Sequence, residues 1–249
     1  MQLATADGVN LHVRELGEGP PVVMLHGLVI GSMMTWYFSA APRLSTRFRV
    51  VLFDLRGHGK SEMVKHGYDL STMCSDLQDV VDQIARAPVV LVGHSFGALV
   101  ALRFAGMRPD RVTKLVLVDA PLAPAHDIDA FLGQGLDSMA EALPLSLRRS
   151  VSGDGRRSQR FADRIQFFAK ETTLLDDLRK MDRVADSELA AIRCPTLAVY
   201  GADSICKSGG ARIAAEVAGA AVVELAGGHF LPVDAPNELG DLIERFIDG

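Results

Sequence analysis

The stretch that decides the fold of this chain is Pro88-Val89-Val90-Leu91-Val92-Gly93-His94-Ser95-Phe96-Gly97-Ala98-Leu99-Val100-Ala101-Leu102. It begins with a continuous apolar run after a proline, which is typical of a strand buried on both faces. The pattern Gly-x-Ser-x-Gly follows at 93–97 with no spacer, and good helix formers then extend to Met107. The stretch therefore predicts a buried strand, a one-residue corner at Ser95 and a helix, the arrangement called a nucleophile elbow.

The predicted corner at Ser95 explains the two glycines on either side of it. A residue at such a corner is held in a strained backbone conformation, and neighbouring side chains would clash there. Gly93 and Gly97 carry no side chain, so they remove that clash. We therefore expect the Ser95 hydroxyl to project above the end of the sheet. The N–H groups at the start of the following helix would stabilise negative charge at the same point.

Length and composition set limits on the fold and on the ligands. The chain has 249 residues, of which 48% are hydrophobic and 23% charged, enough for one sizeable core with room for a subdomain. Its net charge is -5, and a nucleic-acid-binding protein would usually carry a basic excess. No apolar run is long enough to span a bilayer. We therefore expect neither a nucleic-acid partner nor a membrane partner.

The cysteines and the N-terminal residues bear on the compartment. Cys74, Cys194 and Cys206 are an odd number without close pairs, which argues against a disulfide framework and against a zinc site. The first residues, 1–8, lack the basic and apolar regions of a signal peptide. The sequence therefore predicts a cytoplasmic protein with no metal.

Strand-like and helix-like segments alternate along most of the chain. A mostly parallel sheet with helices on both faces, the α/β class, is the expected result. Ligands of such sheets bind beyond the carboxyl ends of the strands. Besides the elbow, the predicted strands are Val9–Leu16 at an edge, Val22–Leu25, Phe48–Phe53, Val112–Val118, a strand between Pro195 and Gly201, and Ala221–Leu225. The predicted helices are Met33–Leu44, Ser71–Ala85 with Ser71 or Thr72 as its cap, Gly209–Val217 and Asn237–Ile247.

Two loops after predicted strands carry further candidate residues. In residues 26–32, a glycine that follows a buried strand indicates that the backbone comes close to another group. Leu28 is the preferred second oxyanion donor and Val29 the next choice, while His26 is interpreted as structural. In the loop that begins at Asp54, we interpret Asp54 and Arg56 as a loop-fixing pair. His58, between two glycines, is expected near solvent.

The alternation stops between residues 122 and 192, where no strand-like run occurs. This stretch is too long for a plain loop and is helical in character. We therefore predict a core of residues 1–121 and 193–249 and a helical cap of residues 122–192 over the strand ends. Part of the cap is locally basic, and the interpretation as a solvated helix face is favoured over a landing surface for an anionic carrier. The basic residues are Arg148, Arg149, Arg156, Arg157, Arg160 and Arg164.

With these pieces in order, the chain resembles the α/β-hydrolases over essentially its whole length outside the cap. The matching motifs are His26-Gly27, the run at 54–61, the elbow at 93–97, Gly201-Ala202-Asp203 and Gly228-His229-Phe230. The resemblance implies an α/β-hydrolase fold with a mostly parallel sheet flanked by helices.

The family order of nucleophile, acid and histidine implies the catalytic set Ser95, Asp203 and His229. A serine hydroxyl needs an imidazole to accept its proton, and the imidazole needs a carboxylate to orient it. Asp203 is preferred as the acid, but Asp119 also follows a strand end and stays the alternative. The family usually has a proline soon after this acid, and residues 204–208 contain none.

The resemblance further implies hydrolysis of an ester-type bond, a carboxylic ester or lactone, through an acyl-enzyme, with Phe96 and Leu28 forming the oxyanion hole. No cofactor is required. Ser95 argues against the branches of the family that use an aspartate nucleophile. Two alternatives stay open: an acyl thioesterase acting on carrier-protein or CoA esters, and a cyclase, lyase or ligand-binding member of the fold. The expected partner is a small-molecule acyl substrate.

Overall fold

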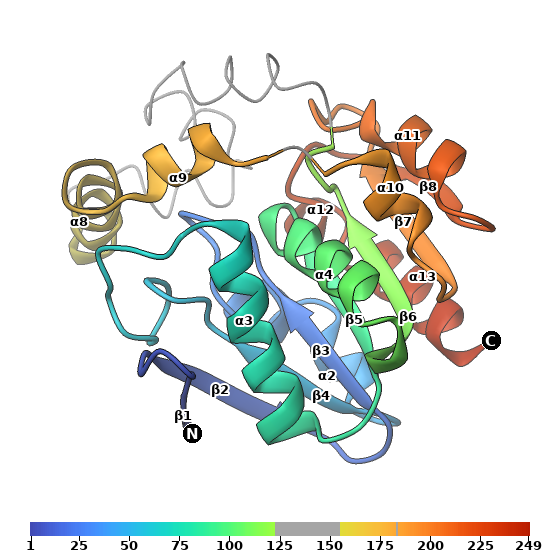
Figure 1. Ribbon diagram of the computed structural model, residues 1–249, viewed down its shortest axis with the longest axis horizontal. Coiled ribbons are helices and arrows are strands. Elements are labelled where there is room, and N and C mark those ends of the chain that lie inside the picture. Colours follow the sequence, from blue (N-terminus) through green and yellow to red (C-terminus); the bar gives the residue numbers. More distant parts are fainter. Residues whose placement is uncertain (123–154, 183) are drawn as a thin grey trace.

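The computed structural model describes residues 1–122, 155–182 and 184–249 (Figure 1). Within these residues, eight strands form one sheet in the order β1-β2-β4-β3-β5-β6-β7-β8. The two pairs that involve β2 are antiparallel and all the others are parallel. The strands are β1 (Gln2–Ala4), β2 (Asn10–Leu16), β3 (Pro21–Leu25), β4 (Arg49–Phe53), β5 (Val89–His94), β6 (Val112–Val118), β7 (Thr196–Gly201) and β8 (Ala221–Leu225).

Helices cover both faces of this sheet, as the predicted class requires (Figure 1). The central strand β5 shows why: Leu91 packs into the apolar cluster on one face and Val92 into the cluster on the other. Helices α3 (Leu70–Val80), α4 (Phe96–Met107) and α11 (Gly209–Glu216) cover the first face. The second face is covered by α1 (Met34–Tyr37), α2 (Ala41–Leu44), α12 (Leu231–Asp234) and α13 (Pro236–Asp248).

Three local predictions need correction. The helix expected over Met33–Leu44 is two short helices, α1 and α2, separated at 38–40. The cap of α3 is Asp69, whose carboxylate accepts a hydrogen bond from the Thr72 N–H at 2.9 Å, and neither Ser71 nor Thr72 takes that place. Finally, β2 is not the sheet edge, because the short strand β1 pairs with its outer side.

The chain between β6 and β7 is helical where the structure describes it. It contains α8 (Arg156–Glu171), α9 (Leu174–Lys180) and α10 (Asp186–Ala190). Residues 123–154 and 183, which belong to the predicted cap, lie outside the described residues. The division into a core and a cap of residues 122–192 therefore stays a prediction. Among the described helices, none has both the length and the apolar character that crossing a bilayer requires.

Candidate active site

The corner at Ser95 has the predicted geometry. Ser95 follows β5 directly with φ 55° and ψ -125°, a strained conformation for a residue with a side chain, and α4 begins at the next residue. A Cβ on Gly93 would lie 2.4 Å from the Gly97 carbonyl oxygen, and one on Gly97 would lie 2.5 Å from the His26 carbonyl oxygen. Both glycines are therefore required by close backbone contacts. The nucleophile elbow is confirmed as a structural feature.

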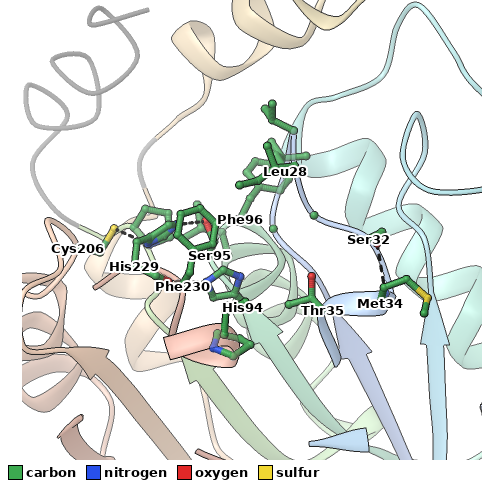
Figure 2. Close-up of a pocket in the computed structure, with 18 of the residues that line it drawn as sticks. Leu28, Ser32, Met34, Thr35, His94, Ser95, Phe96, Cys206, His229 and Phe230 are labelled. Atoms are coloured by element: carbon green, nitrogen blue, oxygen red, sulfur yellow. Dashed lines mark hydrogen bonds between the residues drawn. The ribbon is translucent and has the colours of Figure 1, made fainter. Parts of the chain in front are cut away.

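His229 lies between Ser95 and the carboxylate of Asp119, and its contact with Ser95 is drawn in Figure 2. It lies in the loop after β8, and its Nε2 atom is 2.8 Å from the Ser95 Oγ. Its Nδ1 atom is 2.6 Å from Oδ2 of Asp119. Because a carboxylate only accepts hydrogen bonds, Nδ1 carries the proton and Nε2 is free to accept the Ser95 proton. The imidazole is therefore in the tautomer that a general base for Ser95 needs.

Asp119 is held in place by three hydrogen bonds to its carboxylate. The side chain is fully buried directly after β6, the strand that pairs with β5. Its Oδ1 accepts the Gly201 N–H at 2.9 Å, and its Oδ2 accepts both His229 and the Ser204 hydroxyl, the latter at 2.5 Å. Asp119 adopts a positive φ of 51°, which aspartate tolerates better than most residues. These contacts fix the carboxylate toward the imidazole.

The prediction that the carboxylate of Asp203 contacts His229 is wrong, because the carboxylate of Asp119 takes that position. Asp203 is exposed, and its backbone N–H, at 3.0 Å from the Gly227 carbonyl oxygen, ties it to the His229 loop. The next residue, Ser204, donates its hydroxyl proton to Oδ2 of Asp119. Successive side chains of this loop thus point in opposite directions: that of Ser204 contacts Asp119, and that of Asp203 is exposed to solvent. One feature of the sequence favours Asp119: it comes directly after strand β6, just as Ser95 comes directly after strand β5.

The two predicted oxyanion donors, Phe96 and Leu28, line the same pocket as Ser95 (Figure 2). Phe96 is the first residue of α4, so its N–H has no partner within the helix. In residues 1–122, 155–182 and 184–249, no group accepts the Leu28 N–H. The alternative donor Val29 is committed elsewhere, since its N–H donates to Nε2 of His58 at 2.8 Å. Between these two choices, the structure favours Leu28, whose oxyanion role with Phe96 stays a prediction.

Two buried histidines hold the loop that carries Leu28. His26 donates from Nδ1 to the Gly27 carbonyl and accepts the Leu55 N–H at Nε2. His58 donates from Nδ1 to the Arg56 carbonyl and accepts the Val29 N–H. His26 is structural, as predicted, whereas the expectation of His58 near solvent is wrong, because its side chain is completely buried.

The predicted loop-fixing pair of Asp54 and Arg56 acts through other partners. Asp54 accepts the backbone N–H groups of Met33 and Lys60, which ties its own loop to the start of α1. The Arg56 guanidinium forms a buried ion pair with Asp76 of α3. Both residues therefore fix loops, but they do so separately.

His94, within the elbow motif, forms a hydrogen bond to the main chain of His229. Its Nε2 atom lies 2.8 Å from the His229 carbonyl oxygen and must carry the proton, because a carbonyl only accepts. The two imidazole rings lie 5.2 Å apart between centroids. Burial, together with the neighbouring His229, lowers the pKa of His94 to about 3. A neutral His94 therefore holds the main chain of the loop that presents His229, a contact that the sequence analysis missed.

Three buried neutral histidines predict a loss of stability in acid. Burial lowers the pKa of His26, His58 and His94, so below about pH 6.5 the unfolded chain binds more protons than the folded one. The free energy of unfolding should then fall by up to about 1.4 kcal/mol per pH unit for each histidine. For His94 the loss continues toward pH 3, its folded pKa. Urea unfolding between pH 5 and 7 measures this slope. His94→Gln, which keeps an N–H donor, should reduce the slope by up to about 1.4 kcal/mol per pH unit at the acid end of this range, and an unchanged slope would contradict the assignment.

A cavity of about 510 Å³ opens above Ser95 and His229. Apolar side chains from several elements line it, including Leu28 after β3, Met34 of α1, Phe38 directly after α1, Leu178 of α9, Met181 and Ile205. None of the described lining residues is Asp, Glu, Lys or Arg. The volume falls within the range of roughly 300–1,000 Å³ that is typical of small-molecule sites. The serine therefore faces an apolar chamber.

The basic residues of the predicted cap are only partly described. Arg148 and Arg149 lie outside the described residues, as does the side chain of Arg157. Arg156 and Arg160 are exposed on α8, and Arg164 lies 3.4 Å from the Gly59 carbonyl oxygen. The landing surface for an anionic carrier stays a prediction.

Comparison with known proteins places this architecture in a family. Residues 20–145 match the sequence profile of the alpha/beta hydrolase fold. This chain belongs to the alpha/beta hydrolase family. Its structural resemblance is broad: a hydrolase from Pseudomonas aeruginosa superposes with a TM-score of 0.80 at 27% identity, covering 100% of this chain and 98% of that one.

Two sequence relatives of this alpha/beta hydrolase illustrate the range of similarity. The AB hydrolase superfamily protein YisY of Bacillus subtilis is 28% identical over 80% of both chains. The 2-(acetamidomethylene)succinate hydrolase of Mesorhizobium japonicum is 34% identical over 49% of this chain. That match spans 44% of the relative's length, so its substrate does not transfer to this alpha/beta hydrolase.

Proposed function

We propose that this alpha/beta hydrolase cleaves neutral, apolar carboxylic esters or lactones through an acyl-enzyme on Ser95. The observation that carries the proposal is the continuous contact from Asp119 through His229 to Ser95, at 2.6 and 2.8 Å, at the floor of an apolar chamber. A serine, a base and an orienting carboxylate in this order constitute an activated nucleophile.

The first half-reaction forms the acyl-enzyme. Ser95 Oγ attacks the acyl carbon while Nε2 of His229 takes the hydroxyl proton. The carbonyl oxygen becomes an oxyanion, which the N–H groups of Phe96 and Leu28 stabilise. Asp119 stabilises the imidazolium that forms and keeps the ring oriented. His229 then gives its proton to the leaving alcohol oxygen, and the carbon–oxygen bond breaks.

The second half-reaction releases the acid. His229 takes a proton from a water molecule, whose oxygen attacks the acyl carbon and forms a second oxyanion at the same N–H groups. Collapse of this intermediate breaks the bond to Oγ, and the imidazolium returns a proton to Ser95. The side chains and backbone N–H groups of this site supply every proton transfer and every charge-stabilising contact, so the reaction requires no cofactor.

The lining of the chamber supports a neutral substrate. A buried carboxylate or ammonium group needs a charged or strongly polar partner, and the described lining offers hydroxyl and imidazole groups but no ionised side chain of Asp, Glu, Lys or Arg. Phe38 and Met34, which are 76% and 41% exposed, extend the apolar lining to the surface. An uncharged acyl chain fits this surface best.

Labelling with a fluorophosphonate tests the proposed nucleophile. Intact-mass measurement should show one adduct on the wild-type chain and none on Ser95→Ala. Esters, lactones, acyl-CoA thioesters and carrier-bound acyl groups are then compared as substrates. An absent adduct would contradict the serine hydrolase and favour ligand binding or non-hydrolytic chemistry, and faster turnover of the thioesters would favour the thioesterase alternative.

Substrates that differ in acyl length or in terminal charge should differ in kcat/KM as an apolar chamber requires. For p-nitrophenyl esters, kcat/KM should rise with acyl length, by up to about fourfold for each methylene buried, or ~0.8 kcal/mol. The hexanoate ester should exceed its carboxylate-terminated analogue, the adipate monoester, by at least about 100-fold, because an unpaired buried carboxylate costs several kcal/mol. Steady-state kinetics with correction for spontaneous hydrolysis measure both. Equal rates for the two six-carbon esters would refute the neutral-substrate assignment.

A further inference from the structure

Cys206 lies beside the catalytic residues but has no part in the proposed reaction. Its Sγ atom is 3.7 Å from Nδ1 of His229 (Figure 2), the ring nitrogen that also contacts Asp119. One ligand atom from each of Cys206, His229 and Asp119 lies within 4.8 Å of the other two. The fold thus brings a thiol, an imidazole and a carboxylate together from the loops after β7, β8 and β6.

These three groups have the chemistry and spacing of a site for a thiophilic cation. Zn²⁺ prefers sulfur, nitrogen and oxygen ligands in a tetrahedron, where bonds of 2.0–2.3 Å place neighbouring ligand atoms about 3.3–3.8 Å apart. The separation of Sγ from Nδ1 already lies in this range. The Nδ1–Oδ2 distance of 2.6 Å must widen by about 0.7 Å to admit the ion. We propose that Cys206, His229 and Asp119 form an inhibitory site for a divalent cation of the zinc class.

Binding at this site would stop the proposed reaction, and in this respect the inference rests on the proposed function. The Cys206 thiol loses its proton to solvent as the metal–sulfur bond forms. The ion binds the Nδ1 atom of His229 in place of the proton that Nδ1 carries in the free protein. The single proton of the neutral ring then resides on Nε2. That nitrogen faces Ser95 and is no longer a base. Asp119 at the same time exchanges its hydrogen bond to His229 for the cation.

The site is accessible from the chamber above Ser95. Cys206 and His229 both line the chamber, which gives an ion a route to them. Zn²⁺ would therefore act as a reversible inhibitor.

Inhibition by Zn²⁺ of the wild-type enzyme, Cys206→Ser and Cys194→Ser tests the site. Cys194 is a half-buried thiol before β7 and serves as the matched control. Each variant is compared with its own rate without metal. Cys206→Ser should raise the half-inhibitory Zn²⁺ concentration by at least about 100-fold, since even outer-shell changes weaken metal sites 10–100-fold. Cys194→Ser should leave it unchanged. Equal inhibition of all three proteins would overturn the proposal.

A second measurement needs no activity and separates this proposal from the proposed function. Co²⁺ added to the wild-type protein should produce a thiolate-to-cobalt charge-transfer band at one equivalent, and Zn²⁺ should abolish it. Cys206→Ser and His229→Ala should lack the band, while Cys194→Ser and Ser95→Ala should retain it. Circular dichroism verifies that each variant is folded. If the wild-type protein shows no band, the metal site is refuted, even if the protein is an active esterase. If the protein shows the band but has no esterase activity, the metal site is supported and the proposed function is not.

Discussion

Replacing Asp119 with asparagine is expected to lower kcat for ester hydrolysis by about 10⁴-fold. The Asp119 carboxylate accepts the Nδ1 proton of His229, and this leaves Nε2 as the acceptor that faces Ser95. An asparagine amide at the same place donates a hydrogen bond to Nδ1, which stabilises the opposite tautomer with its proton on Nε2. It also removes the negative charge that stabilises the imidazolium. Steady-state kinetics on a p-nitrophenyl ester measures the loss.

Asp203→Asn is the matched control for this variant. The two substitutions are chemically identical, but Asp203 is exposed and Asp119 is fully buried. A surface substitution of this kind changes free energies by less than about 0.5 kcal/mol, so kcat should stay within about twofold of the wild-type value. A severe loss in Asp203→Asn with an active Asp119→Asn would show that the loop after β7 supplies the acid during turnover.

Ser95→Ala should lower kcat by roughly 10³-fold to 10⁶-fold, because the acyl-enzyme can no longer form. His229→Ala should cause a similar loss, since Oγ, 2.8 Å from Nε2, then has no base. The double variant should be no slower than either single variant, because the two residues act as one unit. Kinetics on purified proteins measures all three.

Exposed Ser71 on α3 supplies the control substitution for this series, and Ser71→Ala should retain wild-type turnover. Multiplied losses in the Ser95 and His229 double variant would contradict the shared role of the two residues. Retained turnover in Ser95→Ala would point to a different nucleophile.

The parts of the site that could be predicted from sequence depend on short-range constraints. The elbow follows from one apolar strand, two glycines and a helix, all within 88–107, and the structure reproduces it with φ 55° at Ser95. His229 follows from a histidine preceded by two glycines after the last strand. In both cases the neighbouring residues leave few conformations, so the direction of the side chain is nearly fixed.

The acid could not be chosen this way, because both candidates follow a strand end. The choice depends on side-chain direction and on strand order: β6 lies directly beside β5, and β7 lies one strand further away. One step along the loop after β7 separates the exposed Asp203 from the inward Ser204. Long-range contacts also decide the burial of His58, whose ring packs 4.8 Å from that of Phe168 in α8.

The position of Asp119 has a consequence for how the enzyme could diversify. With the Asp119 carboxylate directly after β6, the strand beside β5, the loop after β7 carries no residue that takes or gives a proton in the proposed reaction. Its side chains are divided between two tasks: Ser204 supports Asp119, while Ile205 is 55% exposed and lines the chamber. Substitutions at Ile205, in evolution or in a saturation library, would thus change substrate preference and leave the chemical step unchanged. The proposed chemistry and the shape of the chamber would then depend on different residues.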